Sequence, residues 1–358
     1  MWDEGVWDEF VHQSPPMRVV FGAGSAARLG EELDRLGLSR VLVLCTPGQE
    51  ALGRKVADGL GPRAAGLHPH ARMHVPVEVA ARAREVAAEL GADGCVAAGG
   101  GSTIGLGKAI ALQHGLPVVA LPTTYAGSEM TPIWGLTEDG RKRTGRDPAV
   151  LPRSVVYDPE LTLGLPVPLS VTSGFNAVAH AVEGLYAPDT SPILSLMARE
   201  GAQALLDALP GIAADPTGLP ARTRALYGAW LCGAVLGATT MSLHHKLCHV
   251  LGGTFDLPHA EVHTVVLPHV AAFNAPAAPA LTALLGLEPG GALWDLAATL
   301  DAPRSLAALG MPADGVAEVV RQAAAAPYAN PRPVTEADLT RIVEAAHRGT
   351  RPEPERAK

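Results

Sequence analysis

The chain has 358 residues, of which 47% are hydrophobic, and its formal net charge is -8. Single hydrophobic cores stop growing at roughly 250 to 300 residues, so we expect two domains. The negative charge excludes the broad basic surface that nucleic acids and anionic membranes attract. The acidic start "MWDEGVWDEF" does not resemble a secretory signal, and the four cysteines form no CxxC pair. We therefore expect a cytoplasmic protein without disulfides.

Short β-branched segments alternate with helical segments between residues 17 and 157. The expected strands are "RVVFG", "RVLVLC", "GCVAAGGGS", "PVVALPTT" and "SVVYDP". This alternation predicts a mostly parallel, doubly wound sheet. From about residue 160 the sequence shows Ala- and Leu-rich helical segments and no convincing strand. We predict an α/β domain at 1–158 and an all-helical domain at 159–358, with the cleft between them as a usual place for a ligand.

The longest apolar run, residues 225–243, approaches the length of a membrane span. It is rich in Gly, Ala and Thr and leads directly into a histidine cluster. We interpret it as a core helix, and we expect no membrane association.

Two glycine-rich segments are candidates for a phosphate site. "FGAGSAARLG" lacks the third glycine of a dinucleotide fingerprint, and a structural turn is the better interpretation. "CVAAGGGSTIGLGKAI" places Gly99, Gly100, Gly101 and Ser102 between a strand and a helix. Backbone without side chains can approach a pyrophosphate there, and the helix start offers free N–H groups. The segment predicts a phosphate-bearing cofactor, with a plain tight turn as the alternative.

A third loop, "ALPTTYAGSEMTP", follows the next apolar strand and carries Thr123, Thr124 and Ser128. Loops at the carboxyl ends of neighbouring parallel strands line one crevice, so these hydroxyl groups are candidates for the same ligand. Helix caps and turn hydrogen bonds are the alternative role.

Six of the 13 histidines fall within the 26 residues from 244 to 269. His245 and His249 are four residues apart and share a helix face, and His259 lies beyond a glycine pair. His180, in "SGFNAVAHAVEG", follows Asn176 by one helical turn. His180, His245 and His259 are candidate ligands for a divalent metal with position 176 as the fourth. An amide brings no negative charge, so asparagine at 176 lowers the expected metal affinity.

At these residues the chain resembles the iron-containing alcohol dehydrogenase superfamily and, within it, the maleylacetate reductase family. The resemblance rests on "GGGSTIGLGKAIAL", the segment from "LPTTYAGSEM" to "DPELTLGLP", "SGFNAVAHAVEGLYA", "HHKLCHVLGGTFDLPHAEVHTVVLPH" and "PYANPRPV". It extends from about residue 17 to residue 347. It implies a Rossmann-like N-terminal domain, a helical C-terminal domain, NADH or NADPH as the cofactor, and a homodimer.

The resemblance also assigns residues. Its pyrophosphate loop falls on Gly99, Gly100, Gly101 and Ser102, and its nicotinamide-side loop on Thr123, Thr124 and Ser128. The metal ligands of the superfamily fall on Asn176, His180, His245 and His259. His249 matches a histidine near the reacting carbon.

The chain departs from the metal-dependent relatives at two positions. Asn176 replaces the usual metal-binding aspartate, and Gly105 replaces the aspartate of GGGSxxD. Both departures are typical of maleylacetate reductases and disfavour a tightly bound Fe2+ or Zn2+ ion. After the strand "VLVLC", Thr46 stands where many NAD-specific relatives carry an acid. Both NADH and NADPH therefore remain open.

The resemblance implies a small dianionic unsaturated keto acid as the substrate. Its C=C is conjugated with a ketone, so hydride addition produces a delocalised enolate that hydrogen-bond donors can stabilise without a metal. The hypothesis is that His180, His245 and His259, with Asn176 as a neutral amide, form a polar pocket that binds a ketone or carboxylate oxygen. One imidazole, His249 or His244 beside Lys246, then delivers the proton. Asn176 avoids the repulsion that an aspartate would exert on the dianion. Candidate cations for its carboxylates are Arg141, Lys142, Arg143, Arg146, Lys246 and Arg332.

Three other functions stay open at this stage. One is a metal-dependent alcohol or polyol dehydrogenase, and another is a reductase of a different unsaturated keto acid. The third is a non-catalytic protein that kept the fold.

Overall fold

The structure is a computed structural model and describes residues 10–138 and 141–354, with the side chains of Arg141 and Lys142 outside the described part. The chain divides into two compact units. An α/β unit contains residues 14–165 and 217–226, and a helical unit contains 10–13, 166–216 and 227–354. The α/β unit thus takes in a short segment from the half of the chain that was assigned to the helical domain. There, the fully buried Arg222 donates to the Leu165 carbonyl and the Tyr125 hydroxyl.

The α/β unit is built on one six-stranded sheet and one hairpin. Its strands are β1 (Arg18–Phe21), β2 (Val41–Leu44), β3 (Ala64–His68), β4 (Gly94–Gly99), β5 (Val118–Pro122), β6 (Ile133–Glu138), β7 (Arg141–Arg146) and β8 (Ser154–Tyr157). Its helices are α1 (Leu29–Leu36), α2 (Glu50–Leu60), α3 (Val77–Glu89) and α4 (Gly101–His114).

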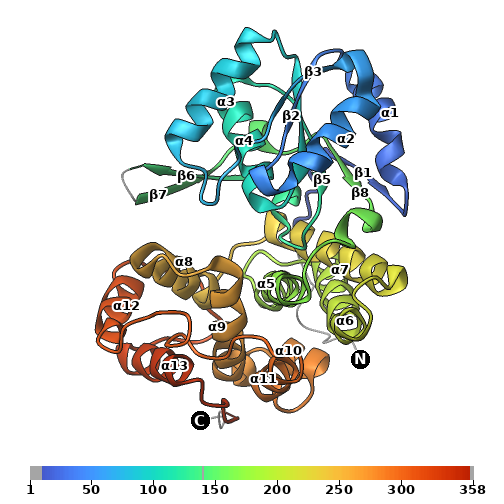
Figure 1. The fold of residues 1–358 in the computed structure, drawn as a ribbon. Helices are drawn as coiled ribbons and strands as arrows, with labels where there is room; N and C mark the ends of the chain where they lie inside the picture. Colours follow the sequence, from blue (N-terminus) through green and yellow to red (C-terminus); the bar gives the residue numbers. More distant parts are fainter. Residues whose placement is uncertain (1–9, 139–140, 355–358) are drawn as a thin grey trace. The chain divides into compact units, whose positions relative to one another are not determined.

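The large sheet has the order β1-β8-β5-β4-β2-β3, and all its pairs are parallel. The inner strands β2, β4, β5 and β8 are buried at every residue, as expected for strands that helices cover on both faces. In Figure 1, α1 and α2 cover one face, and α3 and α4 cover the other. This arrangement confirms the predicted doubly wound α/β class.

Helix α2, strand β3 and the hairpin of β6 and β7 were not predicted. β3 has the sequence AAGLH, which carries few β-branched residues, and it forms an edge of the sheet. β6 and β7 form a separate antiparallel hairpin with Ile133 opposite Arg146. The hairpin escaped prediction because "GRKRTGR" shows charge and no apolar alternation.

The helical unit contains most of α7 and eight further helices among the described residues. These are α5 (Val167–Gly184), α6 (Pro192–Ala214), α7 (Leu219–Ala238), α8 (Leu243–Phe255), α9 (His259–Asn274), α10 (Pro279–Leu285), α11 (Pro289–Thr299), α12 (Gly315–Ala324) and α13 (Glu336–Arg348). The predicted all-helical second half is confirmed.

Helix α5 lies at the centre of the helical unit, in contact with α6 and α9 (Figure 1). It is buried without interruption from Ser170 to Gly184. A Cβ atom at Gly174 would lie 2.8 Å from a methyl carbon of Leu209 on α6, and one at Gly184 would lie 2.1 Å from a methyl carbon of Val235 on α7. The two glycines therefore allow α5 to pack closely on both neighbours.

No single helix in the described part of the chain is long and apolar enough to cross a membrane. Helices α7 and α8 meet the length and composition criteria only as a pair, and the chain bends by 94° between them.

Candidate active site

The glycine turn after β4 keeps the backbone close to its neighbours. Gly100 is the N-cap residue of α4, and no side chain caps this helix within the described residues. A Cβ atom at Gly99 would lie 2.4 Å from Oγ1 of Thr103, and one at Gly100 would lie 2.8 Å from Cγ2 of Thr124. Glycine is thus required for this packing. The uncapped helix start offers backbone N–H groups and a positive dipole end to an anion.

The turn lies at the point where the connections of the sheet change direction. β2 continues through α2 to β3 on one side, whereas β4 continues through α4 to β5 on the other. Ligands of open parallel sheets bind outside the carboxyl ends of the strands at such a point. Thr46 follows β2 there, and Thr123 follows β5. The structure therefore brings the predicted cofactor residues together at the carboxyl ends of the neighbouring inner strands β2, β4 and β5.

Gln49 links these segments, and the sequence analysis missed it. Its Nε2 donates to Oγ1 of Thr123 at 2.8 Å, and its Oε1 accepts from Oγ1 of Thr46 at 3.4 Å. Gln49 lies in a short 3-10 turn without a recognisable motif. Its place three residues after Thr46, at the end of a buried strand, was the available signal.

The loop after β5 is held by a buried lysine that the sequence analysis also missed. Lys108 on α4 is 1% exposed, and its Nζ donates to the carbonyl oxygens of Ser128 (2.6 Å), Thr131 (2.8 Å) and Ile133 (2.8 Å). It also donates to Oγ1 of Thr131 at 3.0 Å. Burial lowers the pKa of Lys108 to about 7, and the carboxylate of Glu129 opposes this shift. Ser128 is thereby fixed relative to the helix that follows the glycine turn.

The first glycine segment forms a structural turn. The carboxylate of Asp158 accepts the N–H groups of Gly24 and Ala26, both at 3.0 Å, and Oγ of Ser25 donates to the Tyr157 carbonyl. These contacts occupy the N–H groups that a phosphate would otherwise use.

Six histidines of the helical unit form one cluster. They come from three helices: His180 from α5; His244, His245 and His249 from α8; and His259 and His263 from α9. The ring centroids are 5.1 Å apart for His180 and His245, 6.3 Å for His245 and His249, and 4.4 Å for His259 and His263. His249 is exposed and His259 is half-buried, whereas the other four are buried. The structure thus gathers every histidine that the sequence analysis named.

Glu183, which the sequence analysis overlooked, lies behind this cluster. It is fully buried on α5, three residues after His180. Its Oε2 accepts from Nδ1 of His245 at 2.7 Å, and Nε2 of His245 is 2.9 Å from Nδ1 of His180. The spacing of Glu183 and His180 on one helix face was the signal in the sequence.

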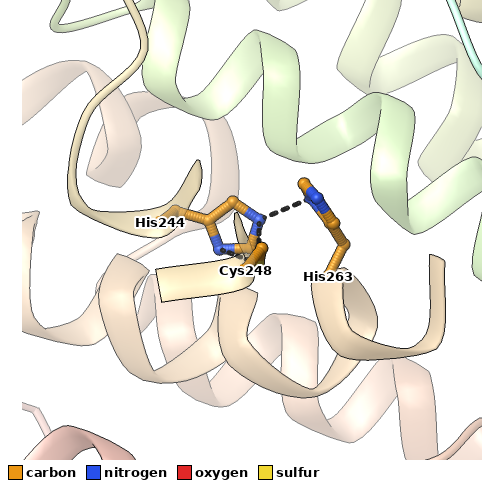
Figure 2. Close-up of side chains that lie close together, drawn as sticks. All are labelled: His244, Cys248 and His263. Atoms are coloured by element: carbon orange, nitrogen blue, oxygen red, sulfur yellow. Dashed lines mark hydrogen bonds between the residues drawn. The ribbon is translucent and has the colours of Figure 1, made fainter. Parts of the chain in front are cut away.

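The group of His244, Cys248 and His263 brings three ligand atoms within 4.8 Å, the one such set of His, Cys, Asp or Glu side chains in the described chain. Figure 2 shows the direct contact between two of them, Nε2 of His244 and Nδ1 of His263, at 2.9 Å. Burial lowers the pKa of both imidazoles and raises the pKa of the Cys248 thiol. A protonated thiol is a poor ligand, so the hydrogen bond explains the proximity better than a metal does.

The residues that the resemblance assigns as metal ligands fit a divalent ion poorly as they stand. Asn176 is 4% exposed, and its Oδ1 has no hydrogen-bond partner in the described structure. The facing nitrogens of His180 and His245 are in contact with each other. Within the described residues, these two and His259 do not bring three ligand atoms within 4.8 Å. The set also contains no anionic ligand to compensate a divalent charge.

The candidate cations for a substrate differ in their surroundings. Arg332 donates to the Phe273 carbonyl at 2.9 Å and lies over the Phe273 ring at 4.3 Å. Lys246 is half-buried on α8, next to the histidines. Arg143 pairs with Glu138 at 3.4 Å in the exposed hairpin, and Arg146 is exposed as well. Arg141 and Lys142 begin β7, and their side chains lie outside the described part. Lys246 is thus the cation nearest the cluster along the chain.

A Rossmann-like unit with a glycine turn at an uncapped helix start, together with a helical unit that carries a histidine cluster, is the arrangement expected of a nicotinamide-dependent oxidoreductase. Residues 16–159 match the iron-containing alcohol dehydrogenase family, and residues 170–347 match the C-terminal region of the Fe-containing alcohol dehydrogenase family. The chain belongs to this family.

The relatives narrow the assignment within the family. The chain is 56% identical to the maleylacetate reductases of Sphingobium indicum and Burkholderia cepacia over 349 residues, which cover 96% of this chain and 99% of each relative. It is similar to the crystal structure of the maleylacetate reductase of Agrobacterium tumefaciens, with a TM-score of 0.93, 54% identity, and coverage of 96% of this chain and 100% of that one. The predicted resemblance is confirmed.

Proposed function

We propose that this protein reduces the C=C bond of maleylacetate with NADH or NADPH and produces 3-oxoadipate in the breakdown of aromatic compounds. Asn176 carries the proposal. This neutral amide lies one helical turn before His180, whose ring contacts His245, in a chain that matches maleylacetate reductases over nearly its full length. The resemblance implies an aspartate at that position in the metal-dependent alcohol dehydrogenases, and a carboxylate holds a divalent ion better than a neutral amide does.

The cofactor residues support a dinucleotide. The glycine turn and the uncapped start of α4 suit a pyrophosphate, because the N–H groups and the positive dipole end of an uncapped helix start favour an anion. Thr46 offers a hydroxyl group at the end of β2 and no carboxylate. Because no carboxylate stands at this position to repel a 2'-phosphate, Thr46 gives no reason to prefer NADH over NADPH.

The substrate explains why neutral groups suffice. When bound, NADH or NADPH would supply the hydride for the alkene carbon remote from the ketone, and the electron pair of the C=C would become part of an enolate. A delocalised enolate needs hydrogen-bond donors rather than a strong Lewis acid. The histidine cluster presents several N–H donors, and Asn176 adds an amide without a charge that would repel a dianion.

The enolate must then receive a proton on the carbon next to the ketone. His249 is the better donor of the two predicted histidines, because it is exposed and can exchange protons with solvent. His244 is fully buried, its Nε2 contacts His263, and burial holds its pKa well below the usual range. Lys246 offers a cation for one substrate carboxylate. His249→Gln should therefore lower kcat more than His244→Gln in a variant of equal stability.

The direct test follows the loss of NADH or NADPH absorbance with maleylacetate, simple aldehydes and 2-enoic acids as substrates. We expect fast turnover of maleylacetate with at least one cofactor and little turnover of the others. Turnover of simple alcohols and aldehydes that depends on added Fe2+ or Zn2+ would replace this proposal with a metal-dependent alcohol dehydrogenase. Little turnover of maleylacetate beside fast turnover of another unsaturated keto acid would change the substrate.

We also propose that the protein acts as a homodimer, as the resemblance implies. Light scattering coupled to size-exclusion chromatography tests this, and a mass equal to the chain's 36.9 kDa would exclude it.

A further inference from the structure

The buried carboxylate of Glu183 collects donors from the start of helix α8. Its Oε2 accepts the N–H of Ser242 at 2.7 Å, and its Oε1 accepts the N–H of His244 at 2.7 Å. Oε2 also accepts from Nδ1 of His245 at 2.7 Å. Glu183 is 0% exposed, so these partners replace its water shell. A group that accepts from two backbone N–H groups acts as an acceptor toward the ring nitrogen too.

The proton positions of two imidazoles follow from this carboxylate. Because Glu183 accepts, Nδ1 of His245 carries the hydrogen. With a neutral ring, His245 has one N–H and one lone pair, and its Nε2 is then an acceptor. The atom 2.9 Å from it, Nδ1 of His180, must then donate. The two hydrogen bonds therefore point the same way: His180 donates to His245, and His245 donates to the carboxylate of Glu183.

We propose that Glu183 is a positioning residue for the reduction. It fixes the Nδ1–H tautomer of His245 and, through it, that of His180, and these are two of the imidazoles that the sequence predicts at the candidate site. The role is distinct from catalysis, because Glu183 lies behind two imidazoles. The proposal deepens the proposed function, and its consequence for turnover rests on that function. The tautomers themselves depend on no substrate.

Glu183→Gln is the sharpest perturbation, because it keeps the shape and removes one acceptor. Where the amide oxygen replaces Oε2, the N–H of His244 faces an NH2 group and is unsatisfied. Where the NH2 group replaces Oε2, the N–H of Ser242 is unsatisfied and Nδ1 of His245 must become an acceptor. Each arrangement leaves one buried N–H without a partner, so the preference for one tautomer is lost.

The test combines nitrogen NMR with kinetics. Long-range 1H–15N spectra of protein labelled at histidine should show the wild-type His245 and His180 with protonated Nδ1, and Glu183→Gln should give mixed or reversed tautomers. We expect kcat to fall by about 10- to 100-fold, the usual cost of losing such an orienting partner, with little change in KM or in NADH affinity. Glu183→Asp, which keeps the charge, should recover part of kcat.

Asp338→Asn provides the matched control. Asp338 also accepts a backbone N–H, that of Thr335 at 3.0 Å, at the start of α13. A lost helix cap alone should lower stability and leave kcat and the tautomers of His180 and His245 unchanged. A wild-type spectrum with His245 protonated at Nε2 would overturn the proposal without any variant. Unchanged tautomers in Glu183→Gln would overturn it too. Changed tautomers in an enzyme without maleylacetate activity would support the positioning and refute only the proposed substrate.

Discussion

Replacement of Lys108 by Met tests how the loop after β5 is held next to the glycine turn. Methionine is similar in length but donates no hydrogen bond. The variant leaves the carbonyl groups of Ser128, Thr131 and Ile133 without the Nζ donor. It also leaves the carboxylate of Glu129 buried without the cation that lowers its pKa. Because Lys108 is 1% exposed, water cannot replace these contacts in the folded state.

The expected loss is about 3 kcal/mol of unfolding free energy for the α/β unit. A buried carbonyl without a donor costs about 1 to 3 kcal/mol, and Glu129 also loses the electrostatic attraction of a nearby cation. The sum of these terms is an upper bound, for two reasons. Burial already lowers the pKa of Lys108 to about 7, which reflects the desolvation of the ammonium group. Glu129 can also take up a proton, because burial raises its pKa.

Urea unfolding followed by tryptophan fluorescence measures this loss, since Trp134 lies on β6, next to the Ile133 contact. NADH titration of the same samples should show weaker binding, because Ser128 belongs to the loop that Lys108 holds. Lys55→Met is the control, since Lys55 is exposed on α2. A Lys108→Met protein with less than about 1 kcal/mol of destabilisation and unchanged NADH affinity would refute the reasoning.

Three further outcomes follow from other sites. Asn176→Asp should raise the affinity for Zn2+ or Fe2+ in metal analysis and lower maleylacetate turnover about tenfold, since a carboxylate is a better ligand and repels a dianion; an unchanged variant would remove Asn176 from the mechanism. Gly100→Ala should weaken NADH binding, because its Cβ would lie 2.8 Å from Cγ2 of Thr124, and added Thr124→Ser should restore part of it; no recovery would contradict this steric cause. Burial lowers the pKa of His269 to about 4. The native state therefore binds fewer protons than the unfolded chain between the unfolded value of 6.5 and about 4, and stability falls as the pH drops through this window. At pH 5 the loss from His269 is about 2 kcal/mol, and urea midpoints of His269→Leu should depend less on pH than those of the wild type; equal slopes would show that His269 is not the cause.

Much of the fold was readable because its inner strands carry a local signal. "VLVL", "VVALP" and "SVVY" are apolar on both faces, as strands between two helical layers must be. β3, with the sequence AAGLH, lacks this signal, because an edge strand needs to bury less of its surface. The hairpin of β6 and β7 lacks it because its residues are only partly buried, and register there depends on pairing across the chain.

The candidate site divides in the same way. Gly99 and Gly100 were predicted, since three consecutive glycines between a strand and a helix have few other uses. His180 and His245 were predicted from helical spacing and from the resemblance. Gln49, Lys108 and Glu183 were not. Each contacts a segment far away in the sequence, such as the start of α8 for Glu183, 59 residues on at Ser242.

The amino-acid sequence alone determined the alternation of strands and helices, the glycine turn and the histidines at helical spacing. These features depend only on residues close together in the chain. Only the tertiary structure decided which nitrogen faces which partner. A hydrogen bond requires two groups within about 3 Å, and that proximity arises when α5, α8 and α9 pack against one another. The pairing of Glu183 with His245 is therefore a property of the packed helices and of no single segment.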